Sequence, residues 1–439
     1  MNKRFRKKRG YPLAKLLRNV KHLSRPMLHL LLRLFGARGA HVAAKQARQP
    51  LSNKPRILLV HPGHLGSLVM TTPLFHALRT QVPDVYIAVM VGPWSREVLV
   101  NHPDVDQVIV YSFPSIRDGT LGPKSYFSLL KAAKELRRGN YDLAINLRPN
   151  FWWGAALLYL ARIPRRVGHA VEECAPLLTE ALPLPSHEHL TASYLRLLSA
   201  GLSVMGYPSL EEPYTEEHYP LHFEPTAQDC QWIAECLRKE GLDTSTPFGV
   251  IHPGTGGAVK LWRSEGWAMC ATALAQSAKD SLSLHIVLTG SKSEQPLLEE
   301  IAGSVSFPMT IMTNMTLGQL AALLKRAQFV LGVDSGPLHL AAAQGTPTVQ
   351  IFGPTDPAIF GPWGKKEQHT IVASRHRCPT CPMIPCMGLD LLPKEPASHP
   401  CVRLVPEQEV LTAISRRFPH LHLNQENTVV RGVMENLSI

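Results

Sequence analysis

The chain has 439 residues, of which 45% are hydrophobic and 18% charged, so it is a globular sequence long enough for two domains. Its formal net charge is +12, but residues 1–50 hold 14 Lys and Arg and no Asp or Glu. The other 389 residues carry 32 basic and 34 acidic side chains, a net charge of −2. A nucleic-acid-binding protein would carry its basic residues through the folded body, so this class is not expected.

Residues 1–54 are predicted to form a basic arm. Its most apolar stretch, residues 27–35, is interrupted by His29 and Arg33, and it is far shorter than the roughly 20 residues that span a bilayer. No small-residue cleavage site follows, so a secretory signal is not expected. An Arg-rich, acid-free segment with leucines is typical of an arm that lies on an anionic membrane surface. A disordered start or a mitochondrial transit peptide has the same composition.

Strands and helices are predicted to alternate over residues 55–225. A first strand at 56–60 leads through the loop HPGHLGS, residues 61–67, into a helix from about 68 to 79. The pattern then predicts strands at 85–91, 107–111 and 141–146, and helices at 125–138 and 190–202. Polar, proline-bearing sequence at 211–225 indicates the end of this N-terminal domain.

A glycine-rich loop follows a predicted strand early in the second half. After a helix at 228–240 and a strand at 249–252, the sequence reads HPGTGG and then reaches Lys260. Three glycines in four positions, Gly254, Gly256 and Gly257, let backbone N–H groups approach an anion closely. Lys260 adds a positive charge nearby, so the loop is typical of a phosphate-binding turn.

A second candidate turn lies between predicted strands at 329–333 and 348–352. Asp334-Ser335-Gly336-Pro337 begins a helix that runs to about residue 344, and Pro337 suits its first turn because its missing N–H would have no partner there. The free amides and the positive end of the helix dipole attract phosphate. An ordinary helix-capping role for Asp334 or Ser335 is the alternative. Further predicted elements are helices at 265–278, 316–326 and 406–417 and a strand at 284–289.

These patterns predict an α/β protein with two Rossmann-like domains that face a central cleft. The C-terminal domain is expected over residues 226–420, followed by a tail at 421–439. Ligands of open parallel sheets bind at the carboxyl ends of the strands, where both glycine-containing loops lie. The first loop lacks the G-x-G-x-x-G spacing, so NAD binding is not indicated.

Eight cysteines without a secretory signal indicate a reducing compartment. Four of them cluster in a proline-rich segment, as Cys378, Cys381, Cys386 and Cys401. Thiolates at this spacing could hold a structural zinc or iron ion, and four reduced cysteines in a loop are the alternative.

The ordered motifs resemble the family of lipopolysaccharide heptosyltransferases, which are inverting enzymes of the two-domain GT-B fold. The motifs are HPGHLGSLVMTTPLFHALR, YDLAINLRP with RRVGH after it, HPGTGGAVKLW, LTGSKSE and DSGPLHLAAAQGTPTVQIFGPTDP, and they span about residues 57–410. The clustered cysteines also look like a feature of the family's C-terminal region. The arm lies outside the resemblance.

The resemblance implies transfer of heptose from ADP-heptose to a lipid A-linked core sugar, at the cytoplasmic face of the inner membrane and without a cofactor. It implies that Thr255, Gly256, Lys260 and the amides of Ser335 and Gly336 hold the diphosphate. It assigns Asp334 to the heptose hydroxyls, His339 to the nucleotide end and Glu294, more loosely, to the ribose.

One residue departs from the family pattern. The family's first loop reads Gly-Asp, whose aspartate is the general base, whereas this chain has Gly66-Ser67. Serine does not accept a proton near neutral pH, and His64 in the same loop is a possible substitute because imidazole is a competent base. A His64 without a role remains the alternative, as do another nucleotide sugar and a silent sugar-nucleotide binder.

Overall fold

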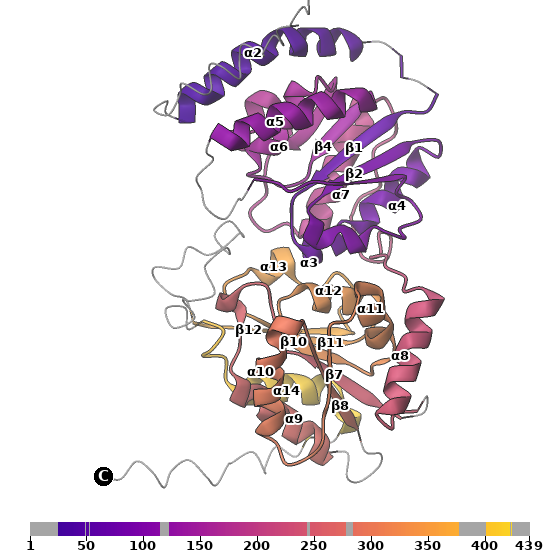
Figure 1. The fold of residues 1–439 in the computed structure, drawn as a ribbon, viewed down its shortest axis with the longest axis vertical. Coiled ribbons are helices and arrows are strands. Elements are labelled where there is room, and N and C mark those ends of the chain that lie inside the picture. The colour runs from indigo at the N-terminus through magenta and orange to yellow at the C-terminus, as the bar shows by residue number, and fades with distance from the viewer. Residues whose placement is uncertain are drawn as a thin grey trace, which may run out of the picture.

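The computed structural model describes residues 25–48, 50–51, 53–114, 123–243, 246–277, 284–376, 401–421 and 423. Over these residues the chain forms two α/β units, one above the other in Figure 1, each built on a parallel sheet. The predicted fold class, two Rossmann-like domains, is therefore confirmed.

The N-terminal sheet has the strand order β3-β2-β1-β4-β5-β6, which is that of the classic dinucleotide-binding fold. Its strands are β1 (Arg56–His61), β2 (Tyr86–Val91), β3 (Gln107–Val110), β4 (Leu143–Asn146), β5 (Arg165–His169) and β6 (Glu180–Leu182). Its helices are α3 (Leu65–Val69), α4 (Thr72–Gln81), α5 (Pro123–Leu136), α6 (Trp152–Leu160) and α7 (Leu190–Val204).

The alternation of side chains along β1 explains the two helical layers of this domain. Ile57 and Leu59 belong to a core cluster with residues of α4 and α7, whereas Leu58 and Val60 belong to a second cluster with residues of α5 and α6. Successive strand residues point to opposite faces of the sheet, so a fully apolar strand is buried on both sides.

The C-terminal sheet has the order β12-β11-β10-β7-β8-β9, which repeats the same topology. Its strands are β7 (Phe248–His252), β8 (His285–Gly290), β9 (Thr310–Thr313), β10 (Val330–Val333), β11 (Thr348–Phe352) and β12 (His369–Ala373). Its helices are α8 (Ala227–Lys239), α9 (Ser264–Ser277), α10 (Gln295–Gly303), α11 (Leu317–Arg326), α12 (Gly336–Ala343), α13 (Pro357–Phe360) and α14 (Glu407–Arg417).

The prediction of one helix over residues 68–79 was wrong, because two helices, α3 and α4, occupy this stretch. Pro73 has no N–H to donate to the carbonyl of Val69, four residues earlier. The hydroxyl of Thr72 donates to that carbonyl instead, at 2.7 Å. The first of the two helices, α3, begins at Leu65, so Gly66 and Ser67 lie in its first turn and not in a loop.

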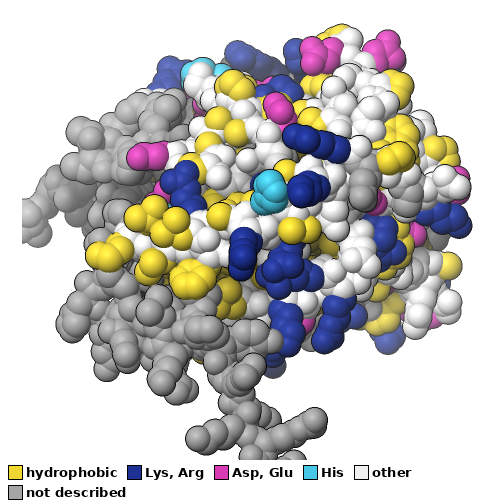
Figure 2. Space-filling model, turned by 90° about the horizontal axis from the view of Figure 1, so that it is seen from above, with side chains coloured by type: hydrophobic (Ala, Val, Ile, Leu, Met, Phe, Trp, Pro, Cys, Tyr) yellow, Lys and Arg dark blue, Asp and Glu magenta, His cyan; other side chains and the backbone are white. Residues whose placement is uncertain are grey.

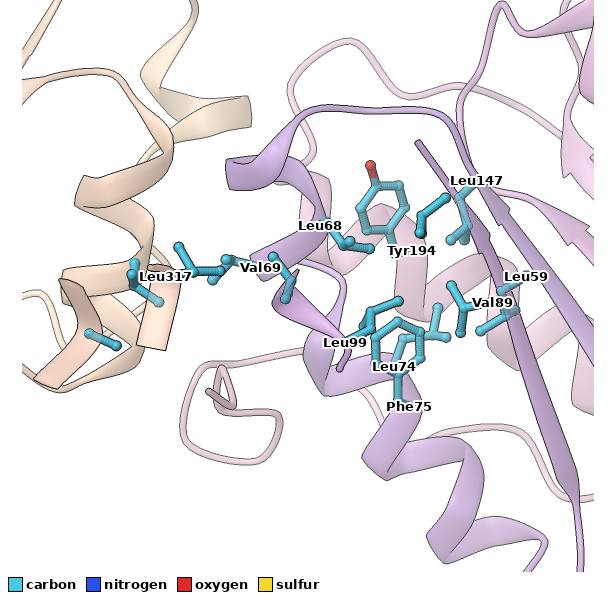
Figure 3. Close-up of a cluster of buried hydrophobic side chains, with 14 of the residues drawn as sticks. Leu59, Leu68, Val69, Leu74, Phe75, Val89, Leu99, Leu147, Tyr194 and Leu317 are labelled. Carbon is cyan, nitrogen blue, oxygen red and sulfur yellow. The ribbon is translucent and has the colours of Figure 1, made fainter. Parts of the chain in front are cut away.

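The apolar core continues from one domain into the other. Leu68 and Val69 of α3 belong to the same buried cluster as Leu317 of α11. Figure 3 shows Leu317 at the edge of the C-terminal domain, on the side of Val69, with Leu68, Leu74, Phe75 and Tyr194 further inside the N-terminal domain. The two domains are therefore joined by packed side chains beside the cleft.

The basic arm contains a 22-residue helix, α2 (Arg25–Gln46), which packs on α6. None of the helices in the described part of the chain is long and apolar enough to cross a membrane.

Candidate active site

The two sheets place their topological switch points opposite each other. In each sheet the first three strands are added toward one edge and the next three toward the other edge. The strand order therefore reverses between β1 and β4 in the N-terminal sheet and between β7 and β10 in the C-terminal sheet. A crevice forms outside the carboxyl ends of strands at such a point, because the following connections leave in opposite directions. The loops that follow β1, β7 and β10 all lie at this crevice. The fold therefore brings together the three loops in which the sequence predicted functional residues.

A cavity of about 730 Å³ lies at this point, between the domains. It is lined by loops and helix starts from both halves of the chain. Six of the predicted site residues contribute to its wall: His64, Thr255, Gly256, Glu294, Ser335 and Gly336. The volume is that of a small-molecule or nucleotide site.

His64 stands at the N-terminus of α3, with its side chain exposed to the cavity. Its loop is held from the next strand connection, where the indole N–H of Trp94 donates to the carbonyl of Gly63 at 2.9 Å. The Trp94 ring also lies 6.4 Å from the imidazole of His64, centroid to centroid. The hydroxyl of Ser67 donates to the carbonyl of His64 at 2.9 Å, so Ser67 closes the first turn of α3. Ser67 thus has a structural hydrogen bond, and His64 is the residue of this loop that reaches the cavity with a titratable group.

His61, at the end of β1, is a poorer candidate for a base than His64. Its ring is buried, and Nε2 lies 3.3 Å from the hydroxyl of Tyr194. Burial, together with the nearby Arg148, lowers the pKa of His61 to about 3. It stays neutral and enclosed at neutral pH.

The helices α3 and α12 approach each other closely across the cleft. A Cβ added to Gly66 would lie 2.7 Å from Cδ2 of His339 and 3.1 Å from Cα of Gly336. A Cβ on Gly336 would lie 3.2 Å from the backbone nitrogen of Gly66. Cβ atoms essentially never come within 3.0 Å of another group, and contacts of 3.1–3.2 Å are tight, so glycine at both positions allows the first turn of α3 to contact the start of α12.

Asp334, Lys260 and His339 form a buried charged cluster behind the cavity wall. Lys260 Nζ lies 2.6 Å from Asp334 Oδ2, and the same oxygen accepts a hydrogen bond from the hydroxyl of Thr355 at 2.6 Å. His339 Nε2 lies 3.6 Å from Asp334 Oδ1. Burial of the carboxyl opposes its ionisation, but Lys260 and His339 outweigh that effect and hold the pKa of Asp334 below its usual range. Asp334 is therefore a fixed negative charge directly before α12.

The start of α12 has unused hydrogen-bonding capacity. Ser335 Oγ and His339 Nδ1 are buried and make no hydrogen bond to any described group. Pro337 in the first turn has no N–H, and the backbone nitrogen of Gly336 lies on the side of α3, 3.5 Å from where a Cβ on Gly66 would stand. An anion at this helix end would gain the dipole and these donors.

Glu294 lies beside the glycine-rich loop that follows β7. A Cβ on Gly254 would overlap the carboxylate of Glu294, so glycine is required where the two loops touch. Glu294 also accepts from the backbone N–H and the hydroxyl of Ser291, both at 2.7 Å, which fixes the carboxylate at the start of η6 (Lys292–Glu294). This is a rigid acidic group at the cavity edge, suited to hydroxyl groups of a ribose.

Sequence reasoning missed several residues of the cavity wall. Trp94 and Glu97 lie on η1 (Pro93–Val98), directly after β2, and residues 314–317 follow β9. Glu97 accepts the backbone N–H of Leu317 at 3.0 Å and so joins the two domains at the N-terminus of α11. The rule that ligands bind at the ends of parallel strands would have singled out the residues after β2, whose strand was predicted.

Of the four cysteines predicted to bind a metal ion, only Cys401 lies in the part of the chain that the structure describes. Cys401 is buried, whereas Cys378, Cys381 and Cys386 lie outside the described residues. Within the described ranges no group of three or more His, Cys, Asp or Glu could hold a metal ion. The cysteine hypothesis therefore remains a prediction.

Two Rossmann-like domains that face a cleft, with anion-binding turns on the C-terminal side and His64 on the N-terminal side, form the architecture of the GT-B class. Comparison with known proteins specifies the family. Residues 129–386, more than half of the chain, match the model of glycosyltransferase family 9 (heptosyltransferase). The chain belongs to this family of transferases.

Individual relatives agree with this assignment. Lipopolysaccharide heptosyltransferase 3 of Escherichia coli K12 is 28% identical over 304 residues, which cover 68% of this chain and 82% of the relative. Lipooligosaccharide heptosyltransferase 2 of Haemophilus ducreyi is 26% identical, with 71% and 87% covered.

Solved structures confirm the fold. The glycosyl transferase family 9 structure from Veillonella parvula matches with a TM-score of 0.67 and 21% identity, covering 85% of this chain and 99% of that one. The E. coli ADP-heptose lipopolysaccharide heptosyltransferase II matches with a TM-score of 0.61 and 21% identity, covering 84% and 99%.

Proposed function

We propose that this protein transfers heptose from ADP-heptose, with inversion, to a core sugar of a lipid A-linked acceptor. The observation that carries the proposal is the cavity between the domains, which joins the α12 turn and the glycine-rich loop to the exposed His64. The relatives' names supply the sugar and the pathway, since they are lipopolysaccharide and lipooligosaccharide heptosyltransferases.

The donor would bind on the C-terminal side of the cleft. Its diphosphate is an anion, and the N-terminus of α12 with Ser335 and Gly336 attracts anions. Thr255 and Gly256 face the same cavity from the loop after β7. Lys260 would contribute through Asp334: the ion pair fixes the carboxylate for sugar hydroxyls, and the ammonium group adds positive potential near the diphosphate.

The acceptor would bind on the N-terminal side, with its hydroxyl near His64. A neutral imidazole removes the hydroxyl proton as the oxygen attacks the anomeric carbon, and the bond to the diphosphate breaks on the opposite face. This order of events inverts the anomeric configuration and releases ADP. We further propose that the enzyme works at the cytoplasmic face of the inner membrane, where a lipid A-linked acceptor is accessible.

A silent binder is the second candidate, because Ser67 occupies the position of the family's base. A measurement of ADP release separates the two. Purified protein is incubated with ADP-heptose, with and without heptose-deficient lipopolysaccharide. Acceptor-dependent ADP release supports transfer, whereas donor binding without release, across a panel of truncated acceptors, supports the silent binder. ADP release with UDP- or GDP-sugars in place of ADP-heptose would move the assignment to another donor.

The donor site is tested by Lys260→Ala, for which we expect donor affinity to fall at least about tenfold because the buried carboxylate of Asp334 loses its cation. The double variant Lys260→Met, Asp334→Asn removes both charges, so weak donor binding in a folded double variant separates a binding role from a folding role. Lys239→Ala, at an exposed position of α8, is the matched control. Unchanged donor affinity in both Lys260 variants, measured by calorimetry, would remove Lys260 from the site.

A further inference from the structure

The helix α2 has one face buried against the N-terminal domain and an opposite face that is partly apolar. The buried face is a stripe of small residues and one leucine, spaced three or four positions apart: Leu32, Gly36, Gly39 and Ala43. Side chains at Gly36 and Gly39 would overlap Tyr159 and Arg162, so α2 lies directly on α6 and the turn that follows it. The Tyr159 hydroxyl donates to the carbonyl of Arg33 at 3.0 Å, which fixes the helix in place.

The outward face of α2 is unlike that of an ordinary surface helix. Met27, Leu30 and Leu34, three or four residues apart and opposite the buried stripe, are 46%, 53% and 64% exposed. A helix on a soluble protein carries polar residues on this face. Phe35 and Val42, at its edge, are also about half exposed. Contiguous exposed apolar side chains of this kind mark a contact surface.

The same face continues with positive charge. Beyond Leu34, its outward positions are taken by Arg38, His41 and Lys45, all exposed, and α2 contains no Asp or Glu. Figure 2, which looks down on this end of the molecule, shows hydrophobic side chains and lysine or arginine side chains next to each other across the middle of the face. A protein partner would need a surface that is both acidic and apolar. An anionic bilayer offers both properties, negative charge in its phosphate groups and apolar surface in its acyl chains.

The direction of α2 relates this face to the cleft. Its start lies beside the start of α6, where the rings of His29 and Trp152 are 4.5 Å apart, and its later turns follow α6 to Arg162. Since α6 begins after the carboxyl end of β4, the apolar half of α2 is the half nearer the cleft edge of the sheet. The basic half lies farther from it.

We propose that α2 lies in the surface of an anionic phospholipid bilayer, with Met27, Leu30 and Leu34 inserted among the acyl chains and Arg38, His41 and Lys45 at the phosphates. The helix would hold the acceptor-binding domain on the membrane and keep the acceptor side of the cleft close to lipid-anchored sugars. This inference rests on the proposed function for the identity of the acceptor, but the contact with lipid is independent of transfer.

The test uses the full chain and vesicles of phosphatidylglycerol and phosphatidylcholine in a flotation assay. The double variant Leu30→Asp, Leu34→Asp is compared with Leu404→Asp, which changes a leucine of similar exposure, 55%, in the C-terminal domain. Measurements at 0.5 M salt screen electrostatic attraction to the vesicles, including that of the nine Lys and Arg of residues 1–24, and leave apolar insertion. We expect vesicle partitioning at this salt concentration to fall by about tenfold or more in the double variant and to stay unchanged in Leu404→Asp.

Equal partitioning of the double variant and the parent chain at high salt would overturn the proposal. A second copy of the chain is the other possible occupant of this face: self-association that is lost in the double variant, together with unchanged flotation, would assign α2 to a dimer. Because Leu30 and Leu34 are mostly exposed, the thermal unfolding temperature should not change, and transfer to a detergent-dispersed acceptor should not change either. If vesicle binding depends on α2 but the protein has no transferase activity, the proposed function is refuted. The proposal that the outward face of α2 binds the bilayer would still hold.

Discussion

At the scale of single residues, the first loop carries the main chemical question. The hydroxyl of Ser67 donates a hydrogen bond to the backbone carbonyl of His64, and the side chain of His64 reaches the cavity. The resemblance to the family implies a general-base carboxylate at position 67, so under the proposed function a different group takes the proton of the acceptor hydroxyl in this chain. An imidazole in its neutral form at pH 7 meets that need.

We therefore expect His64→Ala to lower kcat by about 10²–10⁴-fold, the usual contribution of a general base, with little change in donor affinity. Ser67→Asp should restore most of the activity of His64→Ala, because the new carboxylate would stand in the first turn of α3, where negative charge is favoured. His76→Ala, at an exposed histidine of α4, is the matched control and should keep full activity. Steady-state kinetics across the four proteins decide the point, and a His64→Ala enzyme with parental kcat would exclude this histidine as the base.

At the scale of elements, the sequence predicted strands better than it predicted how one helix is divided. Residues 348–352 form β11 with the predicted bounds, and Gly345 has the expected positive φ of 72°. In contrast, α6 was missed because its sequence WWGAALLYL is buried on all sides and has no polar face to give a helical period. The strands β5, β6, β9 and β12 were also missed: β6, β9 and β12 lie at or near sheet edges and are only partly buried, so they lack the continuous apolar run that marked β11.

The sequence predicted those residues of the candidate site that directly follow a predicted strand. Thr255, Gly256, Ser335 and Gly336 follow predicted strands, and the parallel topology brings strand ends together. Lys260 forms an ion pair with Asp334, a residue 74 positions further along the chain. No local sequence pattern predicts this pairing. Contacts of this kind depend on the packed geometry of two loops and not on the composition of either.

The contact between α3 and α12 gives a prediction about an element. Gly66→Ala should stabilise α3 slightly, since alanine is a better helix former than glycine by up to about 1 kcal/mol, but its Cβ would meet His339 and Gly336. We expect a lower kcat/KM, because the two domains can no longer close to the same distance, and an unchanged or lower unfolding temperature, because lost interdomain packing offsets the gain in helix propensity. Gly303→Ala, in α10 with open space around the site of the new methyl group, should leave kcat/KM unchanged. Parental kinetics for Gly66→Ala would show that the close approach is not needed for the reaction.

At the scale of the whole molecule, the domains are linked by more than the chain that joins them. The apolar cluster around Val69 and Leu317 continues through the interface. Polar contacts lie on its borders, where Glu97 accepts the N–H of Leu317 and the amide of Gln344 donates to the carbonyl of Phe223 at 2.6 Å. A joint that combines a shared core with directional hydrogen bonds favours cooperative unfolding of both domains.

Buried histidines in both domains make this stability depend on pH. Burial is the largest cause that lowers the pKa of His102 and of His369 to about 4. Each is neutral in the folded protein, whereas in the unfolded chain it binds a proton below about pH 6.5. Their stabilising contribution is therefore fully present above pH 6.5 and is lost as the pH falls towards 4. The free energy of unfolding should decrease over this window, by up to about 3 kcal/mol for each such group.

Urea unfolding between pH 8 and pH 4.5 tests this expectation, with His369→Gln as the informative variant. Glutamine does not titrate, so the slope of the unfolding free energy against pH should become shallower by the share of one proton. Stability at pH 8 can fall as well, because the substitution alters the hydrogen bond between the Thr348 hydroxyl and the His369 imidazole, whose atoms lie 2.9 Å apart. His76→Gln, at an exposed position, should keep the parental slope. If His369→Gln also keeps the parental slope, the pKa of His369 is the same in the folded and unfolded protein. The acid sensitivity must then come from the other buried histidines or from the carboxylates.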